Sequence, residues 1–278
     1  MDISALSDGS LLAFVVGLLI AGAVIGFLAG LFGVGGGAIS VPILFETFLF
    51  FGLTDDVAMP LAVGTSLAMI IPTAIVSTRE HSRQGSVDWP LLRAWALPIL
   101  AGVIVGSILA RFAAPAVFQI VFIAVATTTA TKLLLGNPKC RLREDLPPEP
   151  FRSVYGAMLG LASSLMGVGG GAISNMILTL NGRTIHQAVA TSAGVGVLIA
   201  IPAALGYMAA GWGKPGLPPD AIGYVSFAAL AVTIPTALVT AKFGARAAHA
   251  LSRALLSRLF GGFLLLVALN FAISLFGG

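Results

Sequence analysis

Two glycine-rich phrases, each followed by a hydroxyl-bearing pair, are the residues of this chain best suited to bind a ligand. The phrase GVGGGAIS occurs at Gly33–Ser40 and again at Gly167–Ser174, each time inside a long apolar run. A Thr-Ser pair follows each phrase, at Thr65-Ser66 and at Thr191-Ser192. Glycine lets the backbone approach a ligand closely, and hydroxyls are neutral hydrogen-bond donors. The combination favours reversible binding of a small oxyanion.

Each glycine phrase is expected to begin a short helix. A helix N-terminus exposes unpaired N–H groups and carries about +0.5 charge, so two such ends that meet at mid-membrane would attract an anion without lysine or arginine. Small residues also let membrane helices pack closely, which is a second interpretation of the phrases. The candidate binding residues are Gly33, Gly35, Gly36, Gly37, Ser40, Thr65, Ser66, Gly167, Gly169, Gly170, Gly171, Ser174, Asn175, Thr191 and Ser192.

Few other residues have the pattern of a chemical site. Glu46 lies in the apolar segment VPILFETFLFFG and is the candidate for proton coupling, because carboxylates inside a membrane are usually functional. His81, His186 and His249 are expected in loops and lack the spacing of metal ligands. The single cysteine, Cys140, excludes a disulfide framework and a multi-cysteine metal site. We therefore expect neither a metal nor a cofactor.

Composition indicates a membrane protein. Hydrophobic residues make up 58% of the chain and charged residues 9%, whereas a soluble domain carries roughly 25% charged residues. A spanning helix needs about 20 apolar residues. Charge-free windows of about that length or more recur at Gly9–Phe45, Val57–Thr78, Ala94–Ala110, Phe112–Thr131, Ser153–Gly182, Thr184–Gly213, Ala221–Ala241 and Leu259–Gly278. The sequence predicts an all-α polytopic membrane protein, with its net charge of +4 carried by loops rather than by a nucleic-acid-binding face.

The repeated phrases divide the chain into two halves. They lie 134 residues apart, from position 33 to position 167, and the Thr-Ser pairs lie 126 apart, from 65 to 191. We expect a first repeat at 1–135, a cytoplasmic linker at 136–152 and a second repeat at 153–278. Each repeat should contain a glycine-broken, re-entrant or paired short helix followed by three transmembrane helices. The expected segments are 11–32, 36–51, 61–78, 94–110 and 116–135, then 153–166, 171–181, 187–210, 220–241 and 259–276.

Charge sets the expected orientation of the repeats. If they are inverted, 13 of the 15 Lys and Arg residues face one side, and Arg111 and Lys214 alone face the other. The positive-inside rule then makes the basic side cytoplasmic and leaves both chain ends outside. The basic stretch Lys242–Arg258 is expected to form a cytoplasmic interfacial helix.

The doubled GVGGGAIS phrase followed by Thr-Ser resembles the TauE/SafE family of membrane permeases, the sulfite exporter type, over essentially the full length. The resemblance implies transport of a sulfur-containing anion, such as sulfite or an organosulfonate, across the prokaryotic inner membrane. It maps the family's glycine motifs onto Gly33–Gly37 and Gly167–Gly171, and its Thr-Ser element onto both pairs. The second pair departs slightly from the first, since it reads Thr-Ser-Ala rather than Thr-Ser-Leu.

These observations together predict a secondary transporter, not an enzyme, that works by alternating access with its site at the midplane between the glycine tips. An anion channel and a membrane assembly factor without transport activity are the alternatives. The expected partners are a small sulfur-containing anion, protons as a candidate coupling ion, and membrane lipids, with no nucleic acid. Passive export is the alternative to proton coupling. The sequence leaves the substrate, the direction of transport and the oligomeric state open.

Overall fold

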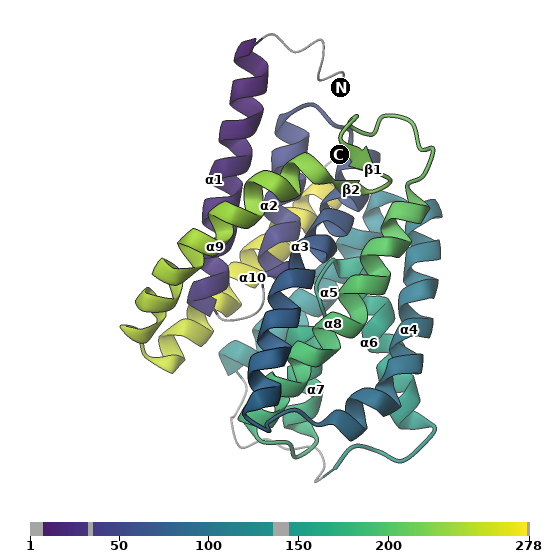
Figure 1. Ribbon diagram of the computed structural model, residues 1–278, viewed down its shortest axis with the longest axis vertical. Helices are drawn as coiled ribbons and strands as arrows, with labels where there is room; N and C mark the ends of the chain where they lie inside the picture. The colour runs from purple at the N-terminus through teal and green to yellow at the C-terminus, as the bar shows by residue number, and fades with distance from the viewer. Residues whose placement is uncertain (1–7, 33–35, 136–144, 277–278) are drawn as a thin grey trace.

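A bundle of long apolar helices surrounds two short ones in the computed structural model, which describes residues 8–32, 36–135 and 145–276 (Figure 1). The first half contains α1 (Asp8–Phe32), α2 (Gly37–Phe50), α3 (Asp55–Arg83), α4 (Trp89–Phe112) and α5 (Pro115–Leu135). The second contains α6 (Phe151–Met166), α7 (Gly171–Leu180), α8 (Ile185–Ala210), the pair β1 (Ala221–Ile222) and β2 (Val225–Ser226), α9 (Phe227–His249) and α10 (Arg253–Phe276). Seven helices of the described chain are long and apolar enough to cross a membrane, which confirms an all-α polytopic membrane protein.

Both glycine phrases interrupt the helical backbone, as predicted. The residues that cap α2 and α7 are Gly36 and Gly170, with φ of +79° and +71°. This left-handed conformation favours glycine, because other residues meet a steric penalty there. The two short helices contain 14 and 10 residues, or roughly 21 and 15 Å of rise. Neither can cross a hydrocarbon core of about 30 Å.

The structure corrects two expectations near α9. The segment expected at 220–241 begins instead with the β1–β2 pair, and α9 starts at Phe227. The separate interfacial helix expected at Lys242–Arg258 is wrong, since α9 continues through His249 and α10 starts at Arg253. The physical reason is that this end of α9 packs against α1 rather than against the membrane surface. A side chain on Gly244 would overlap the backbone of Phe27, so the two helices are in direct contact there.

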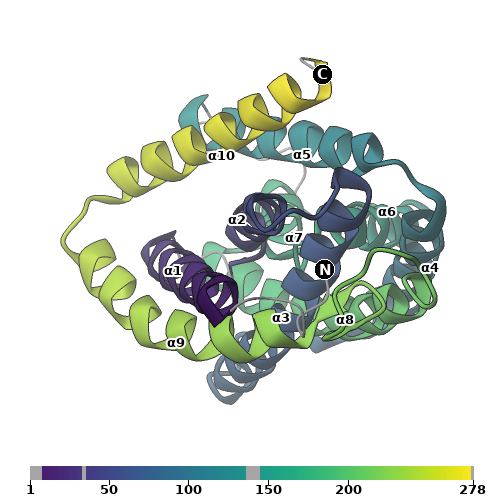
Figure 2. The same ribbon diagram turned by 90° about the horizontal axis from the view of Figure 1, so that it is seen from above.

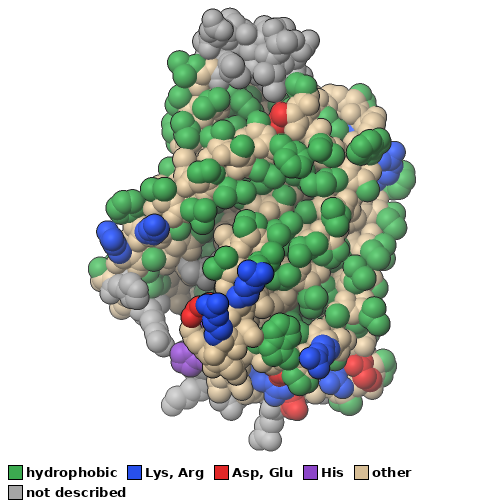
Figure 3. Space-filling view, viewed as in Figure 1, with side chains coloured by type: hydrophobic (Ala, Val, Ile, Leu, Met, Phe, Trp, Pro, Cys, Tyr) green, Lys and Arg blue, Asp and Glu red, His purple; other side chains and the backbone are tan. Residues whose placement is uncertain are grey.

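The longest helix contacts join one half of the chain to the other. Helix α1 packs along α9, α4 along α6, α5 along α10 and α3 along α8 (Figures 1 and 2). Helices α3 and α8 are the most deeply buried of the seven spans and form the centre. The outer face is dominated by hydrophobic side chains, while charged side chains in this view gather mainly toward the lower end and on the left edge (Figure 3). This distribution suits a molecule surrounded by lipid.

Candidate functional site

The two glycine tips meet at the centre of the bundle. A Cβ atom on Gly37, at the start of α2, would lie 2.8 Å from Cα of Val168, in the turn before α7. The Ser66 hydroxyl donates a hydrogen bond of 2.8 Å to the Gly167 carbonyl and fixes the same junction. Gly33 and Gly35 lie outside the described residues. Gly37 of the first tip and Gly167 of the second are therefore close together.

A cavity of about 250 Å³ lies beside the joined tips. Its walls are the tips, the start of α7, one face of α3 and one face of α8. On α3 the lining continues from Ile70 to Ser77, toward the C-terminal end of that helix, and on α8 it continues from Gly196 back to Val189. The cavity therefore opens toward the end of the molecule that carries the α3–α4 and α7–α8 loops, the lower end in Figure 1. The full lining is Gly37, Ile70, Thr73, Ala74, Ser77, Val168, Gly169, Gly171, Ala172, Asn175, Val189, Ser192, Ala193 and Gly196.

Unsatisfied polar groups gather around the start of α7. Gly171 and Ala172 line the cavity, and the N–H groups in the first turn of a helix have no partner within it. Within the described chain, Oδ1 of Asn175 and Oγ of Ser163 are buried and lack a hydrogen-bond partner. Ser163 lies behind the tip, 3.1 Å from the position that a Cβ on Gly170 would take. The amide of Asn175 can present either its oxygen or its NH₂ group to the cavity by rotating its end.

Each phrase is tied to the Thr-Ser pair of its own half through two serines. The Ser40 and Ser66 hydroxyls are 2.6 Å apart, and Ser174 donates to Ser192 over 2.9 Å. In the first half both serines are fully buried and neither lines the cavity. In the second half Ser192 lines the cavity, with Ser174 behind it. Of these four serines, Ser192 alone is placed to contact a ligand.

The two threonines of these pairs join helices rather than line the cavity. Thr65 Oγ1 accepts a hydrogen bond of 3.0 Å from the backbone N–H of Ser226, the residue that caps α9. Thr191 Oγ1 accepts one of 3.0 Å from the N–H of Asp88, which caps α4. Each threonine therefore fastens a central helix to the first turn of a neighbour. Sequence reasoning placed both in the binding site, and their role as acceptors for helix caps was missed.

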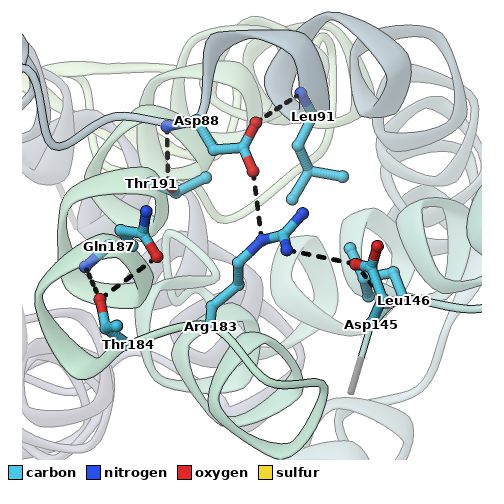
Figure 4. A network of polar contacts seen from close by, with 8 residues as sticks. All are labelled: Asp88, Leu91, Asp145, Leu146, Arg183, Thr184, Gln187 and Thr191. Carbon is cyan, nitrogen blue, oxygen red and sulfur yellow. Dashed lines mark hydrogen bonds and ion pairs between the residues drawn. The ribbon is translucent and has the colours of Figure 1, made fainter. Parts of the chain in front are cut away.

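The joint at Asp88 is extended by ion pairs (Figure 4). The Asp88 carboxylate accepts from the N–H of Leu91 and lies 3.2 Å from Nε of Arg183. Arg183 also lies 3.2 Å from a carboxylate oxygen of Asp145. At the Thr65 joint the corresponding carboxylate is Asp220, which accepts from the Ser226 hydroxyl over 2.6 Å. Asp88, Arg183 and Asp145 therefore join the start of α4 to the α7–α8 loop and to the segment before α6. In the sequence these three residues were only separate loop charges.

Toward the N-terminal end of α3 the bundle is closely packed. Tyr207 is buried, and its hydroxyl donates to the Ser164 carbonyl over 2.9 Å. The backbone of Tyr224, between β1 and β2, occupies the space that a side chain on Gly64 would need. Burial raises the pKa of the Tyr224 phenol above its usual value. None of these residues lines the cavity, whose lining extends toward the opposite end of α3.

Comparison with known proteins identifies the family. The model of the family described as "Sulfite exporter TauE/SafE" matches residues 18–271. The chain belongs to the TauE/SafE family. It is 34% identical over 258 residues to a "Probable membrane transporter protein" of Haemophilus influenzae, covering 92% of this chain and 97% of that protein. It is 32% identical over 227 residues to a probable membrane transporter protein of Methanocaldococcus jannaschii, covering 81% and 80%. No solved structure matches it.

Family membership confirms the resemblance carried by the doubled glycine phrase. It makes this TauE/SafE protein a multi-pass membrane transporter and not an enzyme. The names of the relatives specify no substrate. The part of the site found only in the structure is the polar face of α3, formed by Thr73 and Ser77. A signal for it was present in the sequence, since the two residues are four apart in the part of α3 that follows the apolar stretch Leu67–Ile71.

The proton-coupling candidate lies away from this cavity. Glu46 accepts a hydrogen bond of 2.8 Å from the Asn270 amide, in an open groove of about 480 Å³ between α1, α2 and α10.

Lys132 contacts the C-terminal end of α7. Its amine donates hydrogen bonds to the Met176 carbonyl and to Thr179, at an end of the helix where a positive charge is stabilising.

The histidines were expected in loops, and the structure places them instead at the ends of helices. His81 lies in α3, His186 in α8 and His249 in α9. Each of these helices continues beyond its apolar part. Because the ends are polar, the sequence pattern predicted loops there.

Proposed function

We propose that this protein is a secondary transporter that moves a small sulfur-containing anion, such as sulfite or an organosulfonate, by alternating access. The observation that carries the proposal is the cavity at the start of α7, where the first helical turn, Asn175 and Ser192 line one space. The sulfur chemistry comes from the family, and the preference for an anion comes from the cavity itself.

The lining of the cavity suits a small anion that must be released. A helix N-terminus attracts negative charge through its N–H groups and its dipole. The hydroxyls of Ser77 and Ser192 add neutral donors, and that of Thr73 can become one by giving up its hydrogen bond to the Ile70 carbonyl. None of the described lining residues is charged. Because no buried arginine or lysine holds the anion, it can leave again. Ile70, Val168 and Val189 provide apolar surface for the carbon group of an organosulfonate.

Two features support alternating access. The cavity lining extends from the tips toward one end of α3 and α8, whereas the bundle around Tyr207 and Tyr224 at the other end is closely packed, as expected for one of two alternating states. The helix pairs α1 with α9 and α4 with α6 match each other when the two halves are exchanged, which supports repeats at 1–135 and 153–278. The charge distribution supports their inverted arrangement. The basic loops support a cytoplasmic assignment for the open end, in a prokaryotic inner membrane with both termini outside.

Proton coupling through Glu46 remains part of the proposal as an indirect mechanism. Helix α2 carries Glu46 near one end and the cavity-lining Gly37 at the other, so a change at Glu46 can be transmitted by movement of that helix. Glu46→Gln should remove the stimulation of flux by a proton gradient and leave anion binding intact. If gradient-driven flux is unchanged in this variant, Glu46 does not couple protons and passive export becomes the better description.

The direct test is uptake of radiolabelled sulfite into proteoliposomes, with taurine and sulfoacetate as competitors. Thr73→Val and Asn175→Val should each lower uptake about tenfold or more, since a hydrogen bond to a charged group contributes about 1.5–3 kcal/mol. Thr47→Val is the matched control. Its hydroxyl, like that of Thr73, donates to its own helix backbone, but it lies in the groove beside Glu46.

The alternatives give different results in the same assay. Uptake that does not saturate with sulfite would favour an anion channel. If no sulfur anion moves and none stabilises the protein against heat, the assembly-factor alternative is favoured. Equal loss of uptake in Thr47→Val and Thr73→Val would place the effect outside the cavity.

A further inference from the structure

Two of the three histidines in the chain line one cavity. His81, from α3, and His186, from α8, contribute to the walls of a space of about 440 Å³, which we term the histidine vestibule. Its other described lining residues are Gln84, Ser86, Val189, Leu256 and Ser257. Val189 also lines the central cavity, so the two spaces adjoin.

A polar stripe leads from the central cavity to the vestibule. On α3, Thr73, Ser77 and His81 follow one another at intervals of four, which places them on one helix face. On α8, Ser192, Val189 and His186 follow at intervals of three in the opposite chain direction. The vestibule therefore lies between the cavity and the open end of the molecule. An anion that enters or leaves by this end passes the two imidazoles.

We propose that His81 and His186 form a second anion site, active when they are protonated, at the mouth of the transport cavity. It takes the same class of ligand as the cavity, a small sulfonate or sulfite anion, and in that respect the inference rests on the proposed function. An imidazolium carries a positive charge and donates from both ring nitrogens. Among side chains, histidine is the one whose charge ordinarily changes between about pH 5 and pH 8. Acidity on this side would then concentrate the anion at the mouth.

The permanently charged residues near the vestibule do not supply the positive charge that the proposal assigns to the histidines. Glu80 pairs with Arg83 over 3.7 Å and accepts from Gln84 over 3.3 Å, so these α3 groups neutralise one another. The charged residues nearest in the chain to the lining residues, among those whose side chains the structure describes, are Arg79, Glu80 and Arg83 on α3, Asp88 beyond Ser86, Arg183 before α8, and Arg258 on α10. In the described part of the chain none of these lines the vestibule. Its switchable charge is that of the two imidazoles.

The test is binding of methanesulfonate to the full-length protein in detergent, at pH 5.5 and at pH 8.0. This probe stays a monoanion across the range, whereas sulfite itself gains and loses a proton. The wild type should bind about tenfold more tightly at pH 5.5, which corresponds to one charge-assisted contact. The double variant His81→Gln, His186→Gln should lose that increase and keep the affinity measured at pH 8.0. His249→Gln, at the end of α9, is the matched control and should retain the increase.

The outcomes separate this inference from the proposed function. Asn175→Val should weaken binding at both pH values, because it alters the cavity rather than the vestibule. A double histidine variant that keeps the full increase at pH 5.5, or a His249→Gln variant that loses it, would overturn the inference alone. No binding by the wild type at either pH would overturn the proposed function and the inference with it. Imidazole NMR signals give an independent readout: those of His81 and His186 should shift with methanesulfonate, and unchanged signals would contradict the site.

Discussion

The two glycine tips share one sequence and nearly one backbone, but only the second presents polar groups to the cavity. Gly36 and Gly170 have φ of +79° and +71° and cap their helices in the same way. Behind Gly36 lies the methyl group of Ala29, whereas behind Gly170 lies the unpaired hydroxyl of Ser163. One turn into α7 the cavity meets Asn175, and the residue at the same place in α2 is the buried Val41. The duplicated phrase therefore builds the tips, and the residues that differ around it make one of them a site.

The same difference extends to the central helices. Thr73 and Ser77 line the cavity from α3, and the residues 126 positions later on α8 are Ile199 and Ala203, both fully buried. A matching space on the closed side would be lined by apolar groups at these positions. The binding surface is therefore one-sided, which the equal phrases in the sequence do not show.

The largest effect is expected when alanine replaces the glycine that caps each tip. Gly170→Ala should lower the free energy of unfolding by about 3 kcal/mol, because the strained φ is combined with overlap of the new Cβ and Ile199, 2.5 Å away. Gly36→Ala should cost about 1 kcal/mol, since its nearest neighbour, Ala29 Cβ, is 3.5 Å away. Thermal unfolding in detergent compares them. Equal losses would mean that the two tips are packed alike.

The threonine joints offer a second comparison. Thr65→Val leaves the buried N–H of Ser226 without its acceptor and should cost about 2 kcal/mol. Thr191→Val removes the corresponding acceptor from Asp88, whose joint is also held by Arg183, and should cost about 1 kcal/mol. Unfolding measurements on both variants would contradict this account if Thr191→Val were the more damaging.

A substitution at Ser163 distinguishes a hydroxyl that takes part in anion binding from one that is only buried and unpaired. Ser163→Ala removes a buried hydroxyl that lacks a partner, so the protein should become more stable, by about 1 kcal/mol. If the hydroxyl supports the anion at the start of α7, methanesulfonate should bind several-fold more weakly to the same variant. Ala29→Gly in the first half serves as the control for binding. Greater stability with unchanged affinity would exclude Ser163 from the site.

The smallest effect is expected at the two ion pairs of Arg183, with Asp88 and with Asp145. Arg183→Gln breaks the contacts with Asp88 and Asp145, which are partly exposed. Such pairs contribute roughly 0–1 kcal/mol, so the apparent melting temperature should fall slightly, and less in high salt. A salt-independent fall of several kcal/mol in the free energy of unfolding would indicate that these ion pairs are essential to the stability of the fold.

Local patterns in the sequence were sufficient for the two glycine breaks and for most of the helices, although not for the two ends of α9. The glycine phrases could be placed because an uninterrupted helix over Gly9–Phe45 would be far longer than the bilayer. Thr73 and Ser77 were missed because their importance depends on which face of α3 meets α8, and a single apolar helix does not specify its partner. The acceptor roles of Thr65 and Thr191 depend in the same way on residues more than 100 positions away.

The central claim, that the binding cavity is one-sided, can be tested by labelling one introduced thiol at a time. With Cys140, the only native cysteine, replaced by serine, Ser77→Cys and Ala203→Cys place thiols at corresponding points of α3 and α8. The account predicts that a small maleimide reacts rapidly with the first, that methanesulfonate slows this reaction, and that the second stays unreactive in folded protein. Equal reaction at both positions, or no protection at position 77, would contradict it.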